Sequence, residues 1–320
     1  MASRSIFQMK RLVFFSFLIL CLIVVVSGKG AIYTPPDVEK VTDQFSRISV
    51  NQGFNVLYGG SNIHQTNNGT NADLILDKTS GSGLISTNKY FYGFFNAALK
   101  LPAGFTSGVV IAFYMSNQGD FPKNHDEIDM ELLGHEKRRD WILQTNLYGN
   151  GSTSTGREEK LYLWFDPTQD YHNYSILWNN HHIVYYVDNV PVREVIHNKA
   201  IGSAYPSKPM SVYVTIWDGS EWATHGGKYG VNYAYSPFVA SLKGIELEGC
   251  IVQQKNNGSG ITCAKKSSVS SLDPVDGTEF SKLSDLQNTG LDWSRRKHMY
   301  YSYCQDTARY KILPPECTSK

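Results

Sequence analysis

The sequence lacks the surplus of basic residues that nucleic-acid-binding proteins carry. Its 320 residues include 30 lysines and arginines against 29 acids, and three of the basic residues fall within residues 1–28. The remaining chain has 27 basic and 29 acidic residues, a net charge of −2. Nucleic acid is recognised by basic surfaces, so the sequence predicts no nucleic-acid partner.

Long apolar runs are also scarce, because the only one extends from Leu12 to Val26. It follows three basic residues, precedes a Ser-Gly pair and is shorter than the roughly 20 residues of a spanning helix. This order predicts a signal peptide over residues 1–28, with an uncleaved anchor as the alternative. The mature chain is therefore predicted to be exported and to make no membrane contact.

Cysteine is rare, and the absence of a Cys-x-x-Cys spacing argues against a cysteine metal site. Cys21 falls within the predicted signal peptide, and the other four cysteines allow three pairings. Their spacing favours two local disulfides, Cys250–Cys263 and Cys304–Cys317, which suit an exported chain. Four Asn-x-Ser/Thr sequons predict glycosylation on a secreted surface: Asn68, Asn150, Asn173 and Asn257.

Helical periodicity is almost absent from the first two-thirds of the chain. Short runs rich in Val, Ile, Tyr, Phe and Trp, such as "GVVIAFYM" and "SVYVTIW", are separated by turn residues. This pattern predicts an all-β sandwich or barrel, and "YSILWNNHHIVYYVDN" predicts a hairpin with its turn near Asn179 and Asn180. The sandwich is assigned to residues 29–240. Residues 241–320 are more polar and are predicted to form a disulfide-stapled extension, with a short helix capped by Asp292.

The segment "HDEIDMELLG", residues 125–134, places acids at every second position. On a strand, His125, Glu127, Asp129 and Glu131 share one face, and Ile128, Met130 and Leu132 share the other. On a helix, Glu127 and Glu131 would be neighbours while Asp129 pointed away. The alternation and the strand-rich surroundings favour the strand.

Three acids on one strand face are open to three interpretations: a solvated surface, a calcium-type cation site or a catalytic pair. Crowded carboxylates shift one another's pKa values apart, as acid and nucleophile roles require. A retaining glycoside hydrolase needs two carboxyl groups about 5–5.5 Å apart. Positions four apart on a strand lie roughly 13 Å apart at Cα, so the two glutamates would have to lean together. A straight strand also spreads its ligands too widely to wrap one ion.

The segment resembles the "HDEIDFEFLG" signature of plant xyloglucan endotransglucosylase/hydrolases, a branch of glycoside hydrolase family 16. "LQTN", "GREEKLYLWFDPT", "IWDGSEWATHGGKYG" and "YYSYCQDTAR" agree with the family in the same order. The resemblance covers nearly the whole mature chain and is closest to the branch with a longer C-terminal extension. Met130 and Leu132 replace two phenylalanines, and no sequon directly follows the signature. The resemblance implies a concanavalin A-like β-jelly-roll sandwich.

The resemblance also implies the site. Glu127 would be the nucleophile, Glu131 the general acid/base, and Asp129 the residue that tunes the nucleophile; a structural hydrogen bond is expected for His125. The implied substrate-binding residues are Gln144, Thr145, Asn146, Gly156, Arg157, Glu158, Trp222, Ala223, Gly227 and Arg309. For Trp217, the sandwich core and sugar stacking are both open, and for Arg309 a surface ion pair is the alternative.

The implied function is cleavage and religation of xyloglucan in the cell wall and apoplast, by double displacement through a glycosyl-enzyme. A predominantly hydrolytic enzyme and a secreted glucan-binding lectin are the alternatives. Xyloglucan would be the donor, and xyloglucan or its oligosaccharides the acceptor. The resemblance implies no cofactor and no metal, and a monomer is expected.

Overall fold

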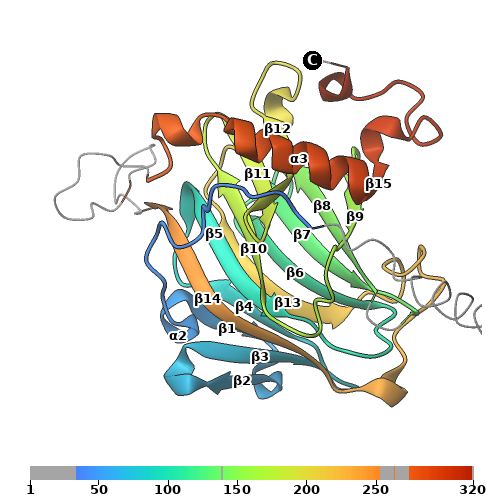
Figure 1. The fold of residues 1–320 in the computed structure, drawn as a ribbon. Coiled ribbons are helices and arrows are strands. Elements are labelled where there is room, and N and C mark those ends of the chain that lie inside the picture. Colours follow the sequence, from blue (N-terminus) through green and yellow to red (C-terminus); the bar gives the residue numbers. More distant parts are fainter. Residues whose placement is uncertain (1–33, 138–139, 253–262, 264–273, 319–320) are drawn as a thin grey trace, which may run out of the picture. The chain divides into compact units, whose positions relative to one another are not determined.

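The computed structural model describes residues 34–137, 140–252, 263 and 274–318. The predicted signal peptide and the sequon Asn257 lie outside these ranges. Within them, no helix has the length and apolar content that crossing a membrane requires. Figure 1 shows a chain built mainly of strands, and the longest helix in the described ranges is α3 (Asp285–Lys297).

The strands form two antiparallel sheets (Figure 1). The eight-stranded sheet has the order β1 (Phe54–Tyr58), β4 (Ser82–Ser86), β13 (Ser211–Asp218), β6 (Val109–Ser116), β7 (Glu127–Gly134), β8 (Trp141–Tyr148), β9 (Glu159–Tyr162) and β15 (Met299–Ser302). The seven-stranded sheet has the order β12 (Val190–Ile196), β11 (His182–Val187), β10 (His172–Trp178), β5 (Tyr90–Lys100), β14 (Phe238–Ile251), β3 (Asn71–Leu76) and β2 (Ile63–Thr66). The predicted all-β sandwich and its hairpin, β10–β11, are confirmed.

Helices are few in the described ranges. The α-helices are α2 (Val50–Gly53) and α3 (Asp285–Lys297). The 3-10 turns are η1 (Gly60–Asn62), η2 (Asn67–Gly69), η3 (Gly202–Ala204), η4 (Tyr233–Tyr235), η5 (Thr278–Phe280), η6 (Tyr303–Gln305) and η7 (Pro315–Cys317).

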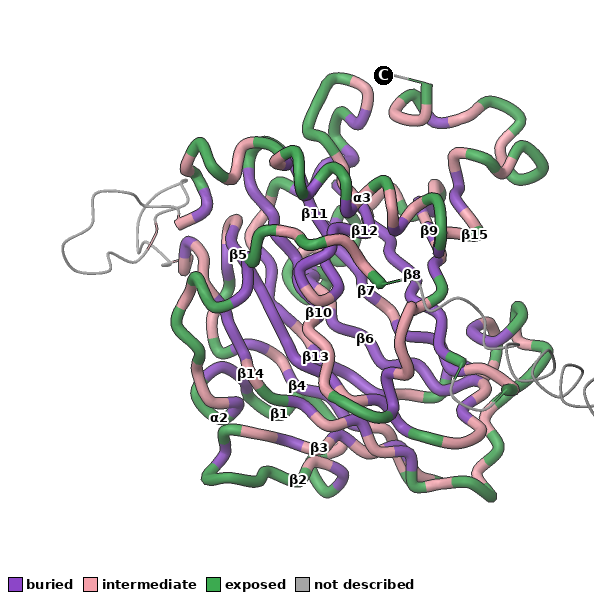
Figure 2. Tube along the Cα trace, viewed as in Figure 1, coloured by how far each residue is buried: buried purple, intermediate pink, exposed green. Residues whose placement is uncertain are grey.

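The hydrophobic core forms where the inner faces of the two sheets meet (Figure 2). Ile128, Met130 and Leu132 of β7 are at most 1% exposed and belong to this core, together with Trp178 and Tyr185 of the other sheet. Apolar side chains at every second position therefore anchor β7. The acids between them must point to the opposite, outer face of the sheet.

Helix α3 begins eight residues earlier than the sequence predicted, counted from N-cap to N-cap. Ser284, not Asp292, is the N-cap: its hydroxyl accepts from the Gln287 N–H, and the Gln287 side chain accepts from the Ser284 N–H. This reciprocal capping box starts the helix inside a segment too polar to show apolar periodicity. A buried Ser294 then fixes the helix against β12 by donating to the Pro191 carbonyl at 2.8 Å.

The extension is continuous with the sandwich. Strand β14 crosses residue 240 and lies between β5 and β3, so the division at 240 remains a prediction placed within one strand. Strand β15 pairs with β9 at the end of the eight-stranded sheet. Both expected disulfides, Cys250–Cys263 and Cys304–Cys317, are formed.

A buried ion cluster joins the extension to the sandwich. Glu159 of β9 accepts two hydrogen bonds from Arg295 of α3, at 2.6 and 2.9 Å, and one from Ser302 of β15 at 2.9 Å. Arg193 of β12 lies 3.7 Å from the same carboxylate. Burial alone would raise the pKa of Glu159, but the charges of Arg193 and Arg295 hold it below its usual value.

Candidate active site

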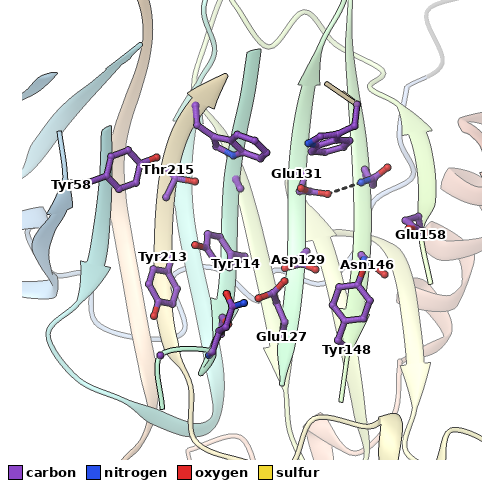
Figure 3. A pocket seen from close by; sticks show the side chains of 17 residues that line it. Tyr58, Tyr114, Glu127, Asp129, Glu131, Asn146, Tyr148, Glu158, Tyr213 and Thr215 are labelled. Carbon is purple, nitrogen blue, oxygen red and sulfur yellow. Dashed lines mark hydrogen bonds between the residues drawn. The ribbon is translucent and has the colours of Figure 1, made fainter. Parts of the chain in front are cut away.

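A cleft of ≈ 740 Å³ crosses the outer face of the eight-stranded sheet. Glu127, Asp129 and Glu131 project from β7 into it (Figure 3). The other lining residues are Tyr58, Ala112, Tyr114, Ser116, Gln118, Gly119, Gln144, Asn146, Tyr148, Glu158, Tyr213, Thr215, Trp217 and Trp222. The predicted strand face of carboxylates is thus the floor of the cleft.

Strand register determines the neighbours of each acid. Glu131 lies between Ala112 of β6 and Gln144 of β8, while Glu127 lies between Ser116 and Tyr148 of the same two strands. Ala112 has a small side chain, and Ser116 hydrogen-bonds to Glu127. Both glutamates line the same cleft.

The three carboxyl groups resist ionisation to different extents. Burial raises the pKa of Glu131 to about 7, although a hydrogen bond from the Gln144 amide at 2.6 Å opposes the rise. Burial also raises the pKa of Glu127, while hydrogen bonds from Ser116 and Asp129 and the nearby His125 oppose it. The environment thus favours a proton on Glu131 near neutral pH.

Asp129 is buried between the two glutamates. Burial, followed by the charges of Glu127 and Glu131, raises its pKa well above the usual range, and the charge of Arg193 opposes this only partly. This favours the protonated form of Asp129, and its hydrogen bond to Glu127 favours the ionised form of Glu127. The hydrogen bond from Asp129 thus favours the ionised form that a nucleophilic Glu127 needs.

His125 and Asp126 precede the strand. Within the described residues the buried Nδ1 of His125 has no hydrogen-bond partner, so the structural hydrogen bond expected of it is not confirmed. The Nε2 atom of His125 lies 4.0 Å from a Glu127 carboxylate oxygen. Asp126 is fully buried and accepts hydrogen bonds from the backbone of Asn150 and from both the backbone and the ammonium of Lys208, at 2.6–2.8 Å. Asp126 therefore ties together the loops at this end of the cleft.

The predicted substrate-binding residues separate into two groups. Gln144, Asn146, Glu158 and Trp222 line the cleft. The other six do not. Of these, Thr145 points to the opposite face of β8, where its hydroxyl accepts from Arg193, and the Arg157 side chain is ion-paired with Glu316 at 2.6 Å. The Arg157 backbone nevertheless donates to the Asn146 side chain at 2.9 Å.

Arg309 reaches the edge of the cleft from the extension. Its guanidinium donates to the Glu158 carboxylate at 2.6 Å, and it is partly exposed. A Cβ at Gly156 would lie 2.2 Å from this guanidinium, so Gly156 leaves the space that the ion pair occupies. Substrate binding by Arg309 and a surface ion pair are both compatible with this contact, because the ion pair itself borders the cleft.

The loop after β13 carries the remaining predicted residues. Ala223 is buried beside Val110, Leu133 and Ile142, with Trp217 and Trp222 packed over this cluster. Gly227 has φ = +87°, and a Cβ there would lie 2.3 Å from the Glu221 carbonyl oxygen, so only glycine fits. Trp217 lines the cleft outside the main core, which favours the stacking expectation for it.

Several cleft residues were missed in the sequence. Tyr58, Tyr114, Tyr148 and Tyr213 come from four strands, and the rings of Tyr114 and Tyr213 stack with centroids 4.7 Å apart. The same alternation that assigned the β7 acids marks Tyr114 between buried Phe113 and Met115. The alternation assigns a face, but the order of strands that brings these tyrosines together is visible only in the fold.

The described sequons lie apart from the acid row. Asn68 and Asn150 are exposed, and Asn173 is half-buried with its side-chain oxygen accepting from Asn96 at 3.2 Å. None of the three lines the cleft.

A row of acids across an open cleft on a β-sandwich is the arrangement of a glycoside hydrolase. Residues 50–235 match the family model "Glycosyl hydrolases family 16", and residues 269–317 match "Xyloglucan endo-transglycosylase (XET) C-terminus". Among solved structures, the Crh5 transglycosylase aligns with a TM-score of 0.51 at 22% identity, covering 67% of this chain and 86% of its own. That similarity concerns the fold alone.

Two curated relatives define the branch. The probable xyloglucan endotransglucosylase/hydrolase protein 28 of Arabidopsis thaliana is 48% identical over 84% of this chain and 79% of its own length. A probable xyloglucan endotransglucosylase/hydrolase 1 of Solanum lycopersicum is 40% identical over 83% and 87%, respectively. The chain belongs to the xyloglucan endotransglucosylase/hydrolase family and is a glycosyl-transferring enzyme.

Proposed function

We propose that this enzyme cuts the β-1,4-glucan backbone of xyloglucan and joins the cut chain to a second xyloglucan chain. The observation that carries the proposal is the row Glu127–Asp129–Glu131 on the floor of an open cleft, with environments that separate the pKa values of its members. The family membership supports the choice of substrate, since xyloglucan appears in the names of the relatives.

The mechanism is a double displacement that retains the anomeric configuration. Glu127 attacks the anomeric carbon of a backbone glucose while Glu131 gives its proton to the departing chain oxygen, forming a covalent glycosyl-enzyme. Glu131, then ionised, takes a proton from the incoming hydroxyl, which displaces Glu127. Asp129 keeps Glu127 ionised before the attack by donating a hydrogen bond to it.

Transfer rather than hydrolysis requires the acceptor chain to compete with water. Trp222 offers a ring face for the apolar side of a sugar, and the Glu158–Arg309 ion pair supplies polar groups at the same cleft edge. Binding at this edge holds the acceptor hydroxyl at high effective concentration. A predominantly hydrolytic enzyme is the second candidate, because an open cleft also admits water.

The proposed setting is the cell wall. We assign residues 1–28 to a cleaved signal peptide, as their basic–apolar–small order predicts. Two disulfides support an oxidising, extracellular compartment. Exposed Asn68 and Asn150 are the sequons best placed for glycosylation, and a monomer is expected.

The proposal is tested by incubating the secreted protein with xyloglucan and a fluorescent xyloglucan oligosaccharide, followed by size fractionation. Label in polymer-sized material is expected. Unlabelled fragments with rising reducing ends would identify a hydrolase instead. If neither product forms and the protein still binds glucan, the lectin alternative is favoured. Glu127→Ala serves as the inactive control.

A further inference from the structure

A second cluster of ligating side chains lies beyond the Trp222 end of the cleft. His135 and Glu136 follow directly after β7, and His225 lies in the loop after β13. The Nδ1 atom of His135 is 2.9 Å from a Glu136 carboxylate oxygen, and the Nε2 atom of His225 is 3.1 and 3.2 Å from the two oxygens of the same carboxylate. One ligand atom from each residue lies within 4.8 Å of the others.

The fold brings these residues together although 89 positions separate Glu136 from His225. Thr224 is buried, and its hydroxyl donates to the Gly134 carbonyl at 2.7 Å while it accepts from the Gly108 N–H at 2.8 Å. This link fixes the residue before His225 to the residue before His135. The two imidazoles consequently lie with ring centroids 5.1 Å apart.

The backbone at His225 is itself unusual. Its φ is +50°, followed by +68° at Gly226 and +87° at Gly227. A left-handed conformation strains a histidine more than a glycine, because a Cβ crowds the backbone there. The loop therefore holds an imidazole, at a conformational cost, in the orientation that faces Glu136.

The Nδ1 atom of His135 faces both a backbone donor and a carboxylate oxygen. The Lys137 backbone N–H donates to Nδ1 at 3.3 Å, so Nδ1 is an acceptor there, yet Nδ1 also lies 2.9 Å from a carboxylate oxygen. Two lone-pair atoms at that distance repel unless a proton or a cation lies between them.

We propose that His135, Glu136 and His225 form a binding site for a divalent transition-metal ion, with zinc as the best match. Two imidazoles and one carboxylate are a three-residue zinc ligand set with a fourth position open to solvent. Tetrahedral ligands about 2.0–2.1 Å from zinc are separated by roughly 3.4 Å. The distances from Glu136 already lie near that value, so only the two imidazoles must approach each other.

The position of the site gives the metal a structural consequence. His135 and His225 line a cavity of ≈ 290 Å³, together with Lys160, Tyr162 and Tyr300 among others. A bound ion would cross-link the end of β7, the strand of the carboxylate row, to the loop that carries Trp222. The metal would thereby fix the orientation of this loop.

The site is tested on the untagged full chain, stripped with a chelator and titrated with zinc chloride by calorimetry at pH 7. One zinc ion per chain is expected, with His135→Ala and His225→Ala each weakening binding at least tenfold. His64→Ala, which removes an exposed histidine of β2 in the other sheet, should leave binding unchanged. Circular dichroism without zinc checks that every variant is folded.

Two results would overturn the inference. One is a wild-type chain that takes up no zinc, and the other is equal zinc affinity in wild type, His135→Ala and His225→Ala. Glu136→Gln provides an independent variant, because it keeps the size of the side chain and should also weaken zinc binding. The readout is metal binding, so the result does not depend on the proposed transfer activity.

Discussion

We predict that the hydrogen bond from Gln144 to Glu131 sets the alkaline limit of activity. In the proposed mechanism Glu131 carries a proton in the first step, so kcat/KM should fall as pH rises through its pKa of about 7. The Gln144 amide donates at 2.6 Å and stabilises the carboxylate form. A hydrogen bond to a charged group contributes about 1.5–3 kcal/mol, and 1.36 kcal/mol corresponds to one pKa unit. Gln144→Met should therefore raise the alkaline limit by about 1–2 pH units.

The assay is the pH dependence of kcat/KM with a xyloglucan oligosaccharide donor and saturating acceptor. Gln144→Met should also lower the maximum value of kcat/KM, because Gln144 lines the cleft. Only the pH at which kcat/KM falls on the alkaline side tests the reasoning. Tyr148→Phe is the matched control, because Tyr148 lines the same cleft but is paired in register with Glu127. An unchanged or lowered alkaline limit in Gln144→Met would refute the assigned role.

Three further changes test other parts of the molecule. Glu127→Ala should abolish transfer while glucan binding, measured by affinity electrophoresis, persists; lost binding would contradict this. Glu159→Gln leaves the buried Arg193 and the half-buried Arg295 without their carboxylate and should lower the free energy of unfolding in urea by about 3–5 kcal/mol. Because the pKa of Glu159 is depressed, the advantage of the wild type should shrink as pH falls through it; a constant difference would argue against the cluster. Replacing Cys304 and Cys317 by serine opens a loop of 13 positions and should cost about 3 kcal/mol, seen as a lower Tm.

Local patterns predicted much of this molecule. Acids alternating with Ile128, Met130 and Leu132 fixed both the strand and its buried face, because each side chain of a strand can reach only one side. The β10–β11 hairpin and the two disulfides were predictable for another reason, because the residues that they join are close in sequence. The resemblance supplied the roles of individual acids, which alternation could not distinguish.

Features that depend on distant partners were not predictable. The start of α3 depends on a capping box in a polar segment, and its docking depends on Glu159 of a remote strand. Arg157 carries a charge that suits a sugar, yet Glu316 of the extension holds it away from the cleft. His225 could not be matched with Glu136, because only the Thr224 link makes them neighbours.

Strand β15 has a consequence beyond its four residues. It occupies the hydrogen-bonding edge of β9, which would otherwise be an open edge able to pair with a second molecule. The chain therefore uses its own C-terminal segment to complete a sheet that begins with the catalytic domain. A chain truncated before residue 274 should self-associate or aggregate in light scattering, where the full chain does not. The C-terminal segment that carries Arg309 thus also covers one edge of the sheet on which the carboxylate row lies.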